Sequence, residues 1–67
     1  MRIAVTNATT AVVFYLNFDL IVEFSFYEQE DGSFFLVYSS KVEDDCFDRM
    51  RVTAEEKNRI LNKLDLL

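Results

Sequence analysis

One dipeptide, Asp31-Gly32, constrains the fold of this 67-residue chain more than any other feature, because it holds the only glycine. Asp-Gly between apolar runs is the strongest short-range signal for a β-hairpin, since glycine readily adopts the positive φ that such turns require. Residues 20–28 alternate between an apolar and a mixed face, as a strand does, and residues 34–39 supply the returning strand. The sequence therefore predicts an antiparallel hairpin that turns at residues 30–33.

A helix is predicted near the C-terminus. A Thr-Ala-Glu-Glu sequence that starts at Thr53 matches a capping box, in which the Thr53 hydroxyl accepts a hydrogen bond from the Glu56 N–H. The Glu56 side chain reaches back to Thr53 in the same motif. Apolar residues then recur at helical spacing, with polar residues on the opposite face. We predict an amphipathic helix over residues 54–65, which Leu61 and Leu64 anchor to the sheet.

The remainder of the chain has the character of β-strands. Residues 2–6, 11–18 and 49–52 contain the β-branched and aromatic residues that strands favour. A single strand over residues 11–28 would be about 60 Å long. That length exceeds the size of a domain with a radius of gyration of about 11 Å, so we expect a turn near residues 17–19.

These elements assemble into one predicted α+β domain that spans residues 1–67. Its sheet is an antiparallel meander of four or five strands, and the C-terminal amphipathic helix packs on one face of that sheet. The chain contains seven Phe and three Tyr, and 51% of its residues are hydrophobic, so a domain this short still has the material for a core.

The predicted sheet carries more apolar side chains than one helix covers. A two-residue turn at the hairpin pairs Phe26 with Val37, whereas a three-residue turn with a bulge pairs Phe26 with Leu36. Both registers leave aromatic and aliphatic side chains of residues 34–38 on the face away from the helix. Either the sheet curls into a partial barrel that buries both sets, or an exposed apolar patch marks a partner surface.

The distribution of charge narrows the range of partners. The net charge is −5, with −8 over residues 19–48 and +2 over residues 49–67. An acidic body repels nucleic acid and anionic membranes, so we expect neither as a direct partner. A nucleic-acid-binding role would rest on a small basic set. That set consists of Arg49, Arg51, Lys57, Arg59 and Lys63.

The chain lacks the usual equipment of an enzyme. It has no histidine, the commonest general base and metal ligand, and a single glycine does not make a phosphate-binding loop. Cys46 therefore has no histidine that could activate it as a nucleophile. Because small secreted domains rely on several disulfides, a chain with a single cysteine is expected in the cytoplasm. The acids Glu43, Asp44, Asp45 and Asp48 could gather a hard cation, but their spacing does not match an EF-hand loop. We predict no catalytic residue, no cofactor and no metal site.

These features favour a protein that acts by binding another protein. Compact acidic domains without catalytic equipment are typical of inhibitors or regulators with which phages and mobile elements block a host machine, anti-CRISPR proteins among them. Such a protein would meet a basic, nucleic-acid-handling partner in the host cytoplasm, because the acidic segment complements a basic surface. The predicted contact residues are Glu28, Glu30, Asp31, Glu43, Asp44, Asp45, Asp48, Tyr15 and Tyr27. The alternative is a structural or assembly subunit that forms a homodimer through a face or an edge of its sheet.

Overall fold

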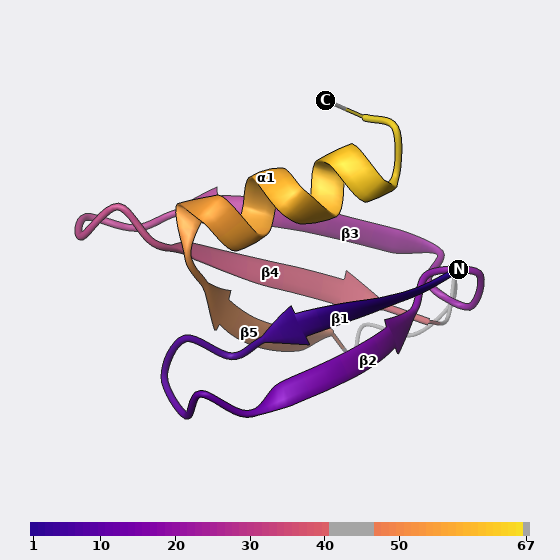
Figure 1. Ribbon diagram of the computed structural model, residues 1–67, viewed down its shortest axis with the longest axis horizontal. Helices are drawn as coiled ribbons and strands as arrows, with labels where there is room; N and C mark the ends of the chain where they lie inside the picture. Colours follow the sequence, from indigo (N-terminus) through magenta and orange to yellow (C-terminus); the bar gives the residue numbers. More distant parts are fainter. Residues whose placement is uncertain (41–46, 67) are drawn as a thin grey trace.

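The computed structural model describes residues 1–40 and 47–66, and in these residues it shows an α+β fold of five strands and one C-terminal helix (Figure 1). Every strand pairing is antiparallel. The elements follow one another as β1 (Arg2–Thr6), β2 (Val13–Asn17), β3 (Glu23–Glu28), β4 (Phe34–Ser39), β5 (Asp48–Val52) and α1 (Ala54–Lys63). The predicted fold class is confirmed, and the predicted helix ends two residues earlier than expected.

The strands form two sheets, so the prediction of a single meander is wrong. β1 pairs with β2 in one sheet, and the other sheet has the order β3-β4-β5. The chain turns near residues 17–19 as expected, because the Asn17 side-chain oxygen accepts from the Asp19 N–H at 3.0 Å and replaces the missing turn glycine. Phe18 then packs against the core and meets the Phe24 ring edge-to-face, with ring centroids 5.5 Å apart. The connection between the sheets is therefore made by packing, not by a hydrogen-bonded ladder.

The β3–β4 hairpin has the register of the three-residue turn. Phe26 pairs with Leu36, and Gly32 has a φ of +85°, which is the conformation that glycine adopts without strain. This register places Phe35 and Val37 on the face away from the helix, where both are half-buried. The guanidinium carbons of Arg49 and Arg51 each lie 4.8 Å from the centre of the Phe35 ring. Arginine side chains thus cover apolar surface that the sequence left unexplained.

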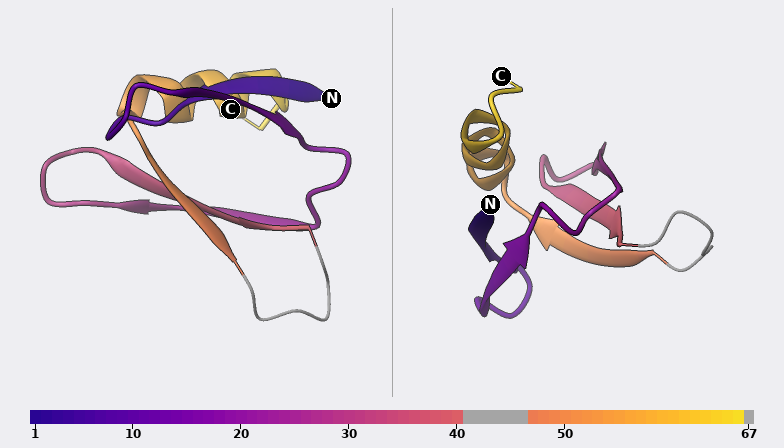
Figure 2. Two further views of the ribbon diagram at one scale, coloured as in Figure 1. Left: turned by 90° about the horizontal axis from the view of Figure 1, so that it is seen from below. Right: turned by 90° about the vertical axis from the view of Figure 1, so that its right-hand side faces the viewer.

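The core lies between the helix and the two sheets. In both views of Figure 2, β1 lies directly beside α1, and the three-stranded sheet lies across from them. The helix contacts β1 and β4. The buried apolar side chains are Ile3, Val5, Leu36, Met50, Val52 and Ile60.

Two residues anchor the helix, Ile60 and Leu64, so the predicted anchor is confirmed for Leu64 and is wrong for Leu61. Ile60 is fully buried and Leu64 packs against the core, whereas Leu61 is only half-buried. Glu56, Ile60 and Leu64 are spaced by four residues and therefore share one face of α1. This face is rotated by one residue from the face that carries Leu61, because successive helical residues lie about 100° apart.

The helix begins at the predicted cap. The Thr53 hydroxyl accepts from the Glu56 N–H at 3.1 Å. We expect Thr53→Ala to lower the free energy of unfolding by about 1 kcal/mol, because the N–H loses its acceptor. Urea denaturation measures this change, and Thr9→Ala in an exposed turn is the matched control. Equal denaturation midpoints for Thr53→Ala and the unmodified protein would contradict the assignment of this cap.

Candidate functional site

The two sheets have four outer edges, and these edges differ in whether their unpaired backbone groups are covered or flanked by charges. An outer strand displays N–H and C=O groups that are ready to pair with another strand. Proteins usually cover such an edge or place charges on it. The four edge strands here are β1, β2, β3 and β5.

Side chains from the helix cover the outer edge of β1. The Thr6 N–H donates to the Glu56 carboxylate at 3.1 Å, and the Arg59 guanidinium donates to the Ala4 carbonyl. Arg59 also donates to both oxygens of Glu56, at 3.0 and 2.8 Å. The hydrogen bonds from Arg59 lower the pKa of Glu56, and the same contact raises the pKa of Arg59. Glu56 therefore binds β1, where the sequence had predicted that its side chain would reach back to Thr53.

Charged residues or a backbone contact protect two further edges. The Arg51 carbonyl of β5 accepts from the Ala8 N–H at 2.8 Å, and this strand carries Arg49 and Arg51. β3 begins at Glu23 and ends at Glu28, and both glutamates are exposed. Charges at the ends of an edge strand oppose the addition of a second strand.

The edge of β2 has neither protection. No charged residue occurs between Arg2 and Asp19. The exposed fractions are 50% for Val12, 48% for Val13, 42% for Phe14 and 75% for Tyr15. Consecutive exposed apolar residues on an open strand are characteristic of a surface that another chain covers.

The backbone of β2 is oriented to accept another strand. The Val12 carbonyl accepts from the Asn7 N–H at 2.9 Å, and the Phe18 N–H donates to the Met1 carbonyl at 2.8 Å. Because pairing alternates along an antiparallel strand, the even-numbered residues of β2 turn their backbone groups to β1. The N–H and C=O groups of Val13 and Tyr15 therefore point away from β1, along the open edge.

The predicted contact residues do not form one site. Tyr15 lies on β2, whereas Tyr27 lies on β3 in the other sheet and is 56% exposed. Asp48 pairs with Tyr38 near the end of the sheet opposite to the β3–β4 turn. The turn and its flank carry three exposed acids, Glu28, Glu30 and Asp31. Glu43, Asp44 and Asp45 lie outside the described residues.

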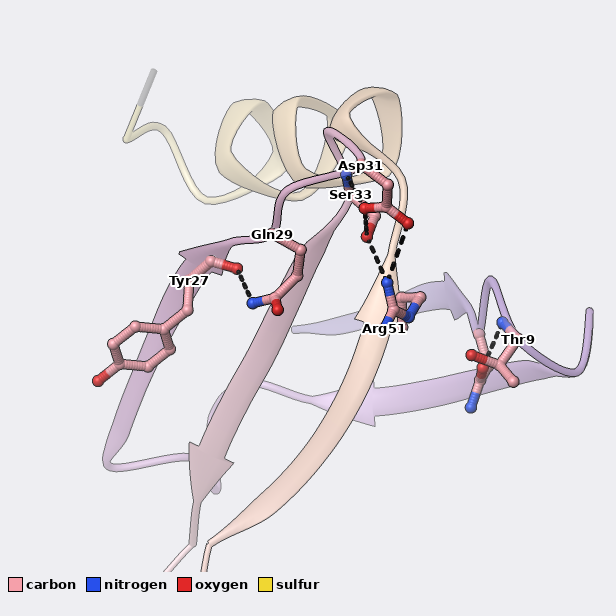
Figure 3. A network of polar contacts seen from close by, with 7 residues as sticks. Thr9, Tyr27, Gln29, Asp31, Ser33 and Arg51 are labelled. Atoms are coloured by element: carbon pink, nitrogen blue, oxygen red, sulfur yellow. Dashed lines mark hydrogen bonds and ion pairs between the residues drawn. The ribbon is translucent and has the colours of Figure 1, made fainter.

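One of the predicted contact acids has a structural role in the hairpin. Asp31 accepts from the backbone and the hydroxyl of Ser33 at 3.0 and 2.6 Å and forms an ion pair with Arg51 at 3.2 Å (Figure 3). Arg51 also donates to the Ser33 hydroxyl at 2.8 Å. These contacts lower the pKa of Asp31, chiefly through the hydrogen bond from the Ser33 side chain. The negative charge of Asp31 is thus partly neutralised by Arg51 of the same chain.

Within residues 1–40 and 47–66, no group of three or more His, Cys, Asp or Glu residues is placed to hold a metal ion. No helix in the same residues is long and apolar enough to span a membrane. Comparisons with models of protein families, with curated proteins and with solved structures found no match.

The predicted contact residues include Tyr15 but not its neighbours Val12, Val13 and Phe14. The signal for these three neighbours was the uncharged run from Ile3 to Phe18, within which they lie on β2 or directly before it, at an edge of the sheet. Whether such a run is buried or exposed depends on the position of its strand in the sheet. The alternation of apolar and polar residues does not predict that position.

Proposed function

We propose that this chain binds another protein and acts as its inhibitor or regulator, with β2 as the contact strand. The observation that carries the proposal is the contrast between β2 and the other three edge strands. Helix side chains cover β1, a backbone contact and arginines protect β5, and glutamates flank β3. The strand β2, by contrast, is uncharged and exposed. A partner strand that adds to β2 would gain main-chain hydrogen bonds, and Val13 and Tyr15 would supply specificity.

The rest of the surface favours a basic partner. Glu23, Glu28, Glu30 and Asp48 are all exposed, and the net charge is −5. Opposite charge on a partner speeds association. A nucleic-acid-handling protein has such a basic surface. We therefore expect the chain to inhibit a host machine of this kind in the host cytoplasm. Phages and mobile elements encode inhibitors of this type, anti-CRISPR proteins among them. Such an inhibitor acts by occupancy and needs no catalytic group.

The test introduces a charge on the open edge. Val13→Lys adds a cation to β2 without removing a core side chain, since Val13 is 48% exposed. Thr9→Lys adds the same charge in the exposed turn before β2 and is the matched control. The unmodified protein is used to isolate a basic partner from host extract, and the purified pair is then measured. We expect Val13→Lys to weaken binding at least about tenfold, which corresponds to about 1.4 kcal/mol, and Thr9→Lys to bind normally.

A second arm tests the acidic surface separately. Glu28→Lys combined with Glu30→Lys should slow association with the same partner, and the effect should shrink as salt rises, because salt screens exposed charges. Normal binding by Val13→Lys would refute the role of β2. An unchanged association rate in the double variant at low salt would remove the acids from the mechanism.

The open edge also supports the alternative of a homodimer. Two β2 strands that pair antiparallel would join the two small sheets into one four-stranded sheet, and the uncharged strands would keep the acids of the two copies apart. Sedimentation of the purified protein at micromolar concentration distinguishes the two functions. A dimer that Val13→Lys converts to a monomer supports this second function, and a monomer without a partner protein argues against it.

A further inference from the structure

A groove of about 440 Å³ opens beside β1, and Arg59, which covers part of the edge of β1, contributes to its lining. This volume lies within the range of about 300–1,000 Å³ that is typical of small-molecule sites. The groove is lined by Met1, Arg2, Ile3, Ala4, Tyr15, Arg59 and Lys63. It brings together the first strand, the exposed tyrosine of β2 and the last turns of the helix.

The shape of the groove follows from the register of the two strands. Arg2 and Ala4 alternate with the buried Ile3, so their side chains lie on the opposite face of β1. Tyr15 is the direct neighbour of Ala4 across the strands. Because the alanine side chain is a single methyl group, the space beside the Tyr15 ring stays open. Arg59 and Lys63, one helical turn apart, form the wall that α1 provides.

The charge of the groove is opposite to that of the molecule. Three of its lining side chains are cationic and none of its described lining residues is acidic, although the net charge of the chain is −5. Glu56 neutralises part of the charge of Arg59, and the Met1 amine forms an ion pair with Asp19. Arg2 and Lys63 add two further positive charges at the groove. These charges would not help the acidic surface to bind a basic partner.

We propose that this groove binds a small organic anion whose carboxylate or phosphate lies between Arg2, Arg59 and Lys63. A flat ring or apolar group of the same molecule would pack on Tyr15, whose side chain is 75% exposed. Cations fix the position of an anionic group, and an aromatic face adds contact area for a planar group. This site lies on the face of the β1–β2 sheet, whereas a partner strand would add along the edge of β2, and Tyr15 borders both.

Benzoate, phenyl phosphate and benzyl alcohol test this proposal as probes with the same ring and different head groups. Each is titrated at millimolar concentration into the 67-residue, ¹⁵N-labelled protein while amide chemical shifts are recorded. We expect saturable shifts at Arg2 to Ala4, Tyr15 and Lys63 with one or both anions, and none with the alcohol. A response to benzoate alone, or to phenyl phosphate alone, identifies the head group that the site prefers.

Two lysine variants with the same change of charge provide the control. Lys63→Gln should weaken binding of the preferred anion about fivefold, because one charged hydrogen bond is lost. Lys57→Gln removes the same charge from the same helix, where the Lys57 ammonium lies 4.5 Å from the centre of the Phe34 ring, and it should bind normally. The proposal is overturned if neither anion shifts the groove amides, if benzyl alcohol shifts them equally, or if both variants lose affinity to the same extent.

Discussion

Replacing Ile60 with alanine is expected to lower the free energy of unfolding by about 2–5 kcal/mol. Ile60 is fully buried, and it is the only residue of α1 that is buried in this way. It packs in the cluster that contains side chains of both sheets, so its loss leaves a cavity where the helix meets them. Small domains have a total stability of about 5–15 kcal/mol, so this variant is expected to lie close to the limit of folding.

Two further variants make this prediction specific. Ile60→Val should cost only about 0.5–1.5 kcal/mol, because most of the side chain remains. Leu61→Ala should cost less than Ile60→Ala, since Leu61 is only half-buried. Urea denaturation followed by circular dichroism measures all three variants. A larger loss for Leu61→Ala than for Ile60→Ala would show that the helix is rotated from the orientation described above.

Removing the charge of Glu56 is expected to lower the free energy of unfolding by about 1.5–3 kcal/mol at neutral pH. Hydrogen bonds to a charged group usually contribute this much. The Glu56 side chain is only 20% exposed, and it holds both Arg59 and the Thr6 N–H. Glu56→Gln keeps the size of the side chain but removes its charge. Glu55→Gln, at the exposed neighbouring position, is the matched control and should change stability little.

The effect of Glu56 should depend on pH in one direction. Because the pKa of Glu56 is lowered in the folded protein, its contribution is fully present above the ordinary pKa of a glutamate. The contribution is lost as the pH falls through the lowered pKa, where the folded carboxylate takes up a proton. The difference in unfolding free energy between the unmodified protein and Glu56→Gln should therefore shrink in acid. A constant difference from neutral to strongly acidic pH would contradict the described contact with Arg59.

The elements that were predicted correctly have local signals. The Thr53 cap starts the helix, and the Asp31-Gly32 turn closes the β3–β4 hairpin, because each depends on residues that are close together in the chain. The register of that hairpin stayed open, since apolar residues line both faces of β4. The positive φ at Gly32 and the pairing of Phe26 with Leu36 decide it.

The features that sequence reasoning missed depend on distant residues. Phe18 packs onto Phe24 where the chain passes from one sheet to the other, but nothing in its local pattern distinguishes this arrangement from a continuous meander. The exposure of β2 follows from its position beyond β1, and the groove joins strand and helix residues that are far apart in sequence. Sequence reasoning placed acids in the candidate site, whereas the structure distributes those it describes over both ends of a sheet.

The cover on β1 has a consequence for how the chain is made. Thr6 and Ala4 are bound by residues that follow them by 50 and 55 positions. A ribosome that adds about 5–20 residues per second needs roughly 3–10 s to synthesise this separation. The β1–β2 hairpin is complete once Asn17 has been added, and from then until Glu56 and Arg59 follow, both of its edges are open to pairing with neighbouring nascent chains. Formation of α1 closes one of them, so the cover on the first strand depends on a segment that is translated after all five described strands.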